Sequence, residues 1–316
     1  MLAAMDRIPL ILDCDPGADD GVALLMAFAS PEFELLGVTT VGGNVGLELT
    51  ARNARIIRQI ANRPDVPVHA GCARAILVAA DDGARDFHGE SGVGTLAIFE
   101  PAEPLADGHA VNFIVDAVMR RPERTVTIAV IGPMTNLAMA MILEPRLAGR
   151  LKQVVAMGGA KREGGNITAS AEFNIWADPH AAQIVLSSGC PVVLIGLDAT
   201  FQVRTTAQRL AAVRALGTPQ STAAAELLAF SQTVYRRLVG ADAPLHDPCT
   251  IAWLLRPKLF ETAPCRIEVE TASELTRGHT AVEFRLDPSE SQDMRWVTRI
   301  DAEGFYELLR QRLGAE

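Results

Sequence analysis

The chain has 316 residues, of which 49% are hydrophobic and 21% are charged, so it can bury a sizeable core and is not expected to be disordered. Its net charge of -9 and its sequence pI of about 5.3 disfavour a broad surface for nucleic acid or for an anionic membrane. This length suits one large α/β domain, and we expect residues 1–316 to form a single domain.

Short apolar runs alternate with helical stretches along the first two thirds of the chain. The predicted strands are residues 9–12, 33–41, 66–70, 126–131, 154–157 and 192–197. The predicted helices are residues 22–29, 48–61, 110–120, 136–143 and 179–187. Continuous apolar runs are typical of strands buried on both faces. The alternation predicts an α/β fold whose open, mainly parallel twisted sheet is flanked by helices in a Rossmann-like core.

The pattern changes from about residue 205. The predicted C-terminal helices are residues 206–216, 221–238, 247–255 and 301–313. Residues 266–271 and 280–285 predict a small antiparallel pair. We therefore expect extra C-terminal helices and one small hairpin to be added to the parallel core.

The cysteines and the N-terminal segment exclude several protein classes. The five cysteines form no CxxC pair, which predicts buried reduced thiols instead of a zinc site or a disulfide framework. The N-terminal segment lacks a basic stretch followed by a long apolar one, and the apolar run at residues 22–29 is too short to span a bilayer. We expect a cytoplasmic protein that acts on a small molecule, without nucleic acid or membrane.

Four carboxylates follow the first predicted strand directly, in the segment DCDPGADD at residues 13–20. Asp19 and Asp20 can cap the next helix or favour its dipole, but this explains one or two of the four acids. Two like charges about 4 Å apart repel by roughly 4 kcal/mol at an effective dielectric constant near 20. A cation or a proton must relieve this cost, and carboxylate oxygens favour Ca²⁺ or Mg²⁺ over zinc.

Other polar residues follow the predicted strands, at the edge where ligands bind in open α/β sheets. They are Asn44, the segment GPMTN at 132–136, Met157-Gly158-Gly159, Asn166, Glu172-Phe173-Asn174 and His246-Asp247-Pro248. Each has an ordinary alternative explanation. Asn44 can form a turn, Glu172 and Asn174 can be solvated loop residues, and Asp247 can cap a helix that begins at Pro248.

Taken together, these segments resemble the inosine–uridine-preferring nucleoside hydrolase family. The matching stretches are DCDPGADD (13–20), TTVGGN (39–44), HGESGVGT (88–95), GPMTNLA (132–138), MGGA (157–160), AEFNIWADP (171–179) and HDP (246–248). They occur in the family's order, and the opening aspartate motif is the most specific of them. The resemblance implies a hydrolase that cleaves the N-glycosidic bond of ribonucleosides to give free base and ribose.

The resemblance also implies a Ca²⁺ site. Asp15, Asp20 and Asp247 match carboxylates that bind the ion, and Ile131 matches a residue whose backbone carbonyl is a ligand. Asp13 matches an acid that supports this cluster by hydrogen bonding. In this interpretation Ca²⁺ binds the 2′- and 3′-hydroxyls and activates water, and Asp15 is the general base.

The substrate contacts follow from the same resemblance. Asp19, Asn44 and Asn174 match residues that hold the ribose hydroxyls, Asn166 and Glu172 match contacts to the 5′-hydroxyl, and Met157 and Phe173 match apolar walls of the sugar pocket. On the base side, His246 is expected to protonate the leaving group, His88 lies in a glycine-rich segment expected to form a flap, and Tyr235 is the expected aromatic contact. Ser231 stands where some relatives carry another aromatic residue, so the base preference stays open. We expect a homodimer or a homotetramer.

Two other functions compete with this interpretation. Asp13-x-Asp15 after a strand is also compatible with a HAD-like, Mg²⁺-dependent phosphohydrolase, in which Asp13 would be the nucleophile. Residues downstream of the motif fit that class poorly. The second alternative is a non-catalytic module that binds ribose or nucleosides, and a turnover assay separates it from an enzyme.

Overall fold

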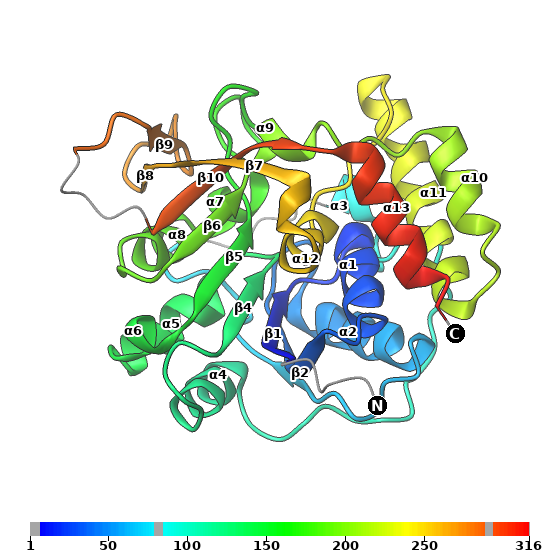
Figure 1. The fold of residues 1–316 in the computed structure, drawn as a ribbon, viewed down its shortest axis with the longest axis horizontal. Helices are drawn as coiled ribbons and strands as arrows, with labels where there is room; N and C mark the ends of the chain where they lie inside the picture. Colours follow the sequence, from blue (N-terminus) through cyan, green and yellow to red (C-terminus); the bar gives the residue numbers. More distant parts are fainter. Residues whose placement is uncertain (1–6, 79–84, 288–292, 316) are drawn as a thin grey trace.

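The structure, a computed structural model, describes residues 7–78, 85–287 and 293–315. Its main sheet has eight strands in the order β3-β2-β1-β4-β5-β6-β10-β7 (Figure 1). The strands are β1 Ile8–Cys14, β2 Phe33–Thr40, β3 Val68–Ala70, β4 Thr127–Val130, β5 Gln153–Met157, β6 Val192–Ile195, β7 Phe260–Pro264 and β10 Met294–Ile300. Neighbouring strands are parallel except for β10 and β7. The predicted mainly parallel sheet is confirmed.

Helices cover both faces of this sheet, because the apolar side chains of strands such as β1 point alternately to each face and must be buried on both. Leu10 and Leu12 belong to one hydrophobic core and Ile11 to the other, because successive strand residues point to opposite faces. The first core is covered by α1 Ala18–Phe28, α2 Leu47–Ile60, α10 Ala207–Arg214, α11 Pro219–Val239, α12 Pro248–Leu255 and α13 Ala302–Leu313. The second is covered by α4 Ala110–Met119, α5 Thr135–Leu143, α6 Leu147–Arg150 and α8 Pro179–Leu186.

Strands β7 and β10 were not predicted, and they extend the sheet by two strands beyond β6. The segment of β10 mixes charged and apolar residues, yet Trp296 and Val297 are buried because β10 lies between β6 and β7. The segment of β7 ends at Pro264, a residue that is tolerated in sheets mainly at edges, and β7 is the edge strand. The predicted small antiparallel pair is confirmed as β8 Arg266–Val269 and β9 Thr280–Glu283.

Short helical segments also escaped the sequence analysis. They are α3 Arg85–His88, α6 Leu147–Arg150, α7 Phe173–Ala177, α9 Leu197–Thr200 and the 3₁₀ turn η1 Pro257–Leu259. The strand predicted at residues 192–197 ends at Ile195, and α9 begins two residues later. Within the described ranges, no helix combines the length and the apolar character needed to cross a membrane.

The sheet brings the predicted site segments together at one edge. Strand β1 pairs with β2 on one side and with β4 on the other, so the chain leaves β1 at the point where the strand order reverses. Ligands bind at such a switch point, beyond the carboxyl ends of the strands. The segments after Cys14, Thr40, Val130 and Met157 all leave the sheet at this edge.

Candidate active site

The turn between β1 and α1 fixes the carboxylate of Asp20. Its Oδ2 accepts hydrogen bonds from the Gly17 N–H (2.9 Å) and from Asn44 Nδ2 (3.1 Å). Its Oδ1 accepts one from the Asp15 N–H (3.1 Å). Asp20 is therefore held rigidly at the start of α1, and it also satisfies backbone donors that the helix leaves free.

Asp15 lies between two glycines. Its Oδ2 accepts a hydrogen bond from the Asn44 N–H (2.8 Å), while its buried Oδ1 has no hydrogen-bond partner among the described residues. A Cβ atom would lie 2.1 Å from Oδ2 if placed on Gly43, and 2.5 Å from Oδ1 if placed on Gly132. The glycines of the VGGN and GPMTN segments thus make room for this carboxylate.

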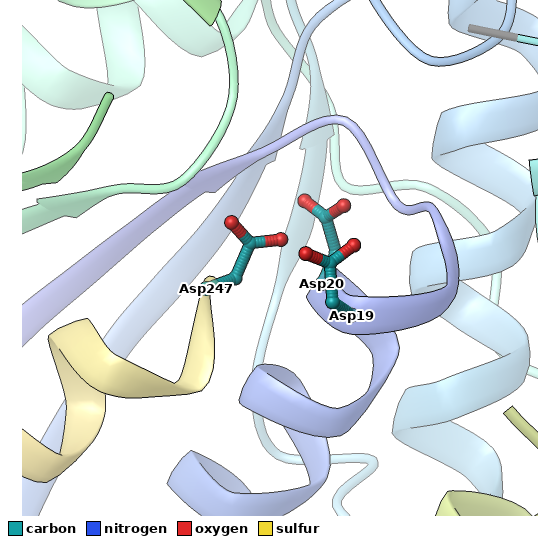
Figure 2. Close-up of side chains that lie close together, drawn as sticks. All are labelled: Asp19, Asp20 and Asp247. Carbon is teal, nitrogen blue, oxygen red and sulfur yellow. The ribbon is translucent and has the colours of Figure 1, made fainter. Parts of the chain in front are cut away.

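Three carboxylates meet beside this turn (Figure 2). Asp19 and Asp20 come from the first turn of α1, and Asp247 directly precedes α12; one oxygen of each lies within 4.8 Å of the others. Asp247 occupies the cap position of α12, but its side chain makes no capping hydrogen bond. The helix-cap explanation of Asp247 is therefore wrong, and the side chain faces the other acids instead.

Burial and neighbouring acids of the described structure dominate the pKa values of the site's carboxylates. Burial, followed by the charge of Asp20, raises the pKa of Asp15 well above its ordinary value. Burial, followed by the charge of Asp19, raises the pKa of Asp20 to about 7 and that of Asp247 well above normal. A bound cation would reverse these shifts by favouring the charged carboxylates.

Asp13 lies in a separate buried network. Its Oδ1 accepts hydrogen bonds from Thr39 Oγ1 (2.7 Å) and from Asn136 Nδ2 (2.8 Å), and burial raises its pKa to about 6. Asn136 also donates to the Thr40 carbonyl (3.0 Å) and accepts from the Cys72 N–H (2.8 Å). Asn136 lies in the matching stretch at residues 132–138, but the sequence predicted no role for it. Its side chain links α5 to the segments of Asp13, Thr40 and Cys72.

A cavity of about 330 Å³ opens beside the three carboxylates. The predicted site residues that line it are Asp19, Asn44, His88, Ile131, Met157, Asn166, Glu172, Phe173, Asn174, Tyr235, His246 and Asp247. Asp13, Asp15 and Asp20 are not among the lining residues. Lining residues without a predicted role include Phe87, Phe201, Thr205 and Val239. No lysine or arginine among the described residues lines the cavity, which therefore suits an uncharged, hydroxyl-rich ligand.

One wall of the cavity is built around Glu172, a buried residue and not a solvated one. Its carboxylate accepts hydrogen bonds from the backbone N–H groups of Asn174 (2.9 Å), Gly159 (3.0 Å) and Ile175 (3.2 Å), and burial raises its pKa to about 7. Asn174 Nδ2 donates to the carbonyls of Ile131 (3.0 Å) and Met157 (3.3 Å). This network joins the ends of β4 and β5 to α7.

Two histidines face the cavity from the other side. His88 Nδ1 accepts a hydrogen bond from the Ala18 N–H (3.2 Å), and His246 Nδ1 lies 2.7 Å from Thr200 Oγ1. Burial lowers the pKa of His88 and lowers that of His246 to about 4. A pKa lowered this far works against the expectation that His246 titrates near neutral pH.

The glycine-rich segment after His88 uses the conformational freedom of its glycines. Gly89, Gly92 and Gly94 have φ angles of +75°, +86° and +57°, a region that other residues rarely adopt. Phe230 of α11 packs against Gly94 so closely that a Cβ atom there would lie 2.3 Å from its ring. This segment is thus shaped to pack closely against α11.

This chain is similar to known proteins in both sequence and fold. The family model described as inosine-uridine preferring nucleoside hydrolase matches residues 10–307. The chain belongs to this family. The nucleoside hydrolase fold accounts for the mainly parallel sheet, the flanking helices and the small antiparallel sheet, and the family's activity class is the hydrolysis of ribonucleosides.

Individual relatives cover nearly the whole of this nucleoside hydrolase. An uncharacterized protein of Schizosaccharomyces pombe is 44% identical over 306 residues, which cover 96% of this chain and 98% of that protein. The pyrimidine-specific ribonucleoside hydrolase RihA of Salmonella gallinarum is 41% identical, with 97% and 98% covered. The solved purine-preferring ribonucleoside hydrolase from Gardnerella vaginalis superposes with a TM-score of 0.91 at 32% identity, with 97% and 98% covered.

Proposed function

We propose that this chain is a Ca²⁺-dependent ribonucleoside N-glycosidase that releases free base and ribose with inversion at C1′. The observation that carries the proposal is the cluster of Asp19, Asp20 and Asp247 beside a cavity without basic lining residues among those described. This arrangement is costly without a cation, because buried like charges repel.

The donor set fits a hard divalent cation. The proposed ligands are the carboxylates of Asp15, Asp20 and Asp247 and the backbone carbonyl of Ile131. The buried Oδ1 of Asp15 has no hydrogen-bond partner among the described residues, so it is free to bind a cation. All of these donors are oxygen atoms, the ligands that Ca²⁺ prefers. When bound, the ion supplies positive charge that attracts the two vicinal hydroxyls and makes water more acidic.

The side chains around the cavity can bind the sugar from several directions. The Nδ2 groups of Asn44 and Asn174 are already committed to protein acceptors, which leaves their Oδ1 atoms to accept hydrogen bonds from ribose hydroxyls. Asp19 offers a further acceptor in the same cavity, and Asn166 and Glu172 lie on the wall assigned to the 5′-hydroxyl. These contacts would orient C1′ toward the attacking water.

The acids also suit the charge that develops during C–N cleavage. The sugar becomes similar to an oxocarbenium ion, so nearby carboxylates stabilise its positive charge. Asp15, beside the proposed ion, would take a proton from the attacking water as general base. The rings of His88 and His246 also line the cavity and would contact the base.

A panel of ribonucleosides tests the proposal, with release of free base and reducing sugar as the readout. The pyrimidine-specific relative makes uridine and cytidine the first substrates to assay, and the purine-preferring one makes inosine the comparison. Exhaustive chelation should abolish turnover, and added Ca²⁺ should restore it. Full activity of a preparation shown to be metal-free by elemental analysis would overturn the role of the ion.

The same panel separates the alternatives. A non-catalytic binding module would bind nucleosides without releasing base. A HAD-like phosphohydrolase would release inorganic phosphate from a phosphate ester, but Asp13, its required nucleophile, is held in a separate buried network by hydrogen bonds from Thr39 and Asn136. The structure therefore offers no support for that alternative.

A further inference from the structure

The hydroxyl of Thr200 makes a single contact that bears on the chemistry of the cavity. Thr200 is fully buried at the end of α9, and its Oγ1 lies 2.7 Å from His246 Nδ1. Within the described residues this is the one side-chain hydrogen bond of Thr200. A buried hydroxyl is costly when its proton has no acceptor. Donation to Nδ1 satisfies it, whereas accepting a proton from Nδ1 would leave the O–H group unpaired.

Backbone hydrogen bonds near Thr200 and His246 fix the position of one residue relative to the other. The Leu245 N–H donates to the Val203 carbonyl (2.9 Å), and the Thr205 N–H donates to the Ala243 carbonyl (2.8 Å). These bonds join the segment before His246 to the segment after α9. The Phe201 ring packs against the imidazole at 5.8 Å between centroids. The imidazole is thereby restricted in both position and rotation.

The other ring nitrogen is free for a ligand. His246 lines the cavity, and its Nε2 has no hydrogen-bond partner among the described residues. If Nδ1 accepts the Thr200 proton, a neutral ring carries its own proton on Nε2. That N–H group can then donate a hydrogen bond to a ring nitrogen or an exocyclic oxygen of the departing base, where negative charge develops.

We propose that Thr200 is a positioning residue that holds His246 as the Nε2–H tautomer facing the base. This inference rests on the proposed ribonucleoside hydrolase function. Thr200 itself would not touch the substrate. It would act through its hydrogen bond to Nδ1, because a partner on one ring nitrogen fixes the tautomer and the orientation of a histidine whose other nitrogen faces a ligand.

The kinetic test compares Thr200→Val with Thr200→Ser. Valine removes the hydroxyl at similar volume, and serine keeps it. We expect Thr200→Val to lower kcat/KM for uridine by about 10- to 100-fold, a part of the 10²- to 10³-fold that one hydrogen-bond donor aimed at developing negative charge can supply. The loss should be much smaller for p-nitrophenyl riboside, whose leaving group needs little stabilisation of its negative charge. Thr200→Ser should restore uridine hydrolysis.

A matched control and a spectroscopic readout separate positioning from general damage. Thr127→Val replaces another fully buried threonine, in β4, and should leave the ratio of the two substrates unchanged. In ¹⁵N-histidine-labelled enzyme with Ca²⁺, the His246 signal, assigned by its loss in His246→Gln, should show Nε2–H in the wild type and in Thr200→Ser. In Thr200→Val that preference should be lost.

Two results would overturn the inference. One is a wild-type His246 ring with its proton on Nδ1, and the other is equal loss on both substrates in Thr200→Val with an unchanged tautomer. If the wild type cleaves no ribonucleoside, the proposed function fails instead. The tautomer spectra still decide whether Thr200 orients His246 in that case.

Discussion

Replacing Gly43 by alanine should disable the site while leaving most of the fold intact. The new Cβ would lie 2.1 Å from Asp15 Oδ2 and 2.9 Å from its Cγ, whereas ordinary contacts are 3.4–4 Å. The carboxylate must therefore move by about 1 Å, and a shift of that size in a catalytic group can cost about 100-fold in rate. The hydrogen bond from the Asn44 N–H to Oδ2 should weaken as well.

Gly46→Ala is the matched control, three residues further along the chain. No atom lies within 4 Å of a Cβ at Gly46, and its backbone (φ −60°, ψ 153°) is open to alanine. We expect Gly43→Ala to lower kcat/KM for uridine by about 100-fold or more and to weaken Ca²⁺ binding, with a loss of about 1–3 kcal/mol in the free energy of unfolding from overpacking. Gly46→Ala should stay within about 1 kcal/mol of the wild type in stability and keep its activity.

Steady-state kinetics, calcium titration calorimetry and urea unfolding measure these three quantities. The calorimetry matters most, since a slower reaction alone could come from a poorly folded fraction. Wild-type kcat/KM together with wild-type calcium affinity in Gly43→Ala would refute the assignment of Asp15 to the metal and the water.

Three further predictions follow from the structure. Uridine should be hydrolysed about 10⁴-fold more efficiently than 2′-deoxyuridine, because the groups that bind the missing hydroxyl would be left unpaired; values of kcat/KM within tenfold of each other would argue against the proposed diol contacts. Thr127→Val should raise the free energy of unfolding by about 1 kcal/mol, since the buried Thr127 hydroxyl has no partner among the described residues; a fall measured in urea would contradict this. Burial raises the pKa of the half-buried Cys72 thiol to about 11 from an ordinary 9.0, so near pH 7.5 it should react with iodoacetamide about 100-fold more slowly than an unperturbed thiol, and tenfold faster for each added pH unit. Peptide mapping of the alkylated native protein measures this rate, and a pH-independent rate would count against it.

Much of the parallel core could be predicted because its strands are short, continuous apolar runs. Residues 33–41 were predicted as a strand, and β2 spans Phe33–Thr40. By contrast, β1 runs through Asp13 to Cys14, although an aspartate usually signals the end of a strand. Asp13 is tolerated there because Asn136, far along the chain, donates to it. No local pattern reveals such a partner.

The site was harder to predict in detail than the fold. The family motifs located the residues that meet around the cavity, but local sequence gives no information on burial. The lowered pKa of His246 comes from its burial, and its contact to Thr200 depends on how α9 meets the segment before α12. Strand β10 was missed for a related reason, because its position between β6 and β7 buries a segment whose composition resembles a surface strand.

Asp247 is far from Asp15 and Asp20 along the chain, and this separation determines when the site can form during synthesis. Asp15 and Asp20 leave the ribosome early, whereas Asp247 follows about 230 residues later, which at 5–20 residues per second is a delay of roughly 10 to 50 seconds. During this interval the nascent chain carries an incomplete set of the proposed cation ligands. Strand β10, which completes the far edge of the sheet, emerges later still. Binding of the proposed cation would therefore be a late event in biogenesis, because it must wait until Asp247 has packed beside Asp20.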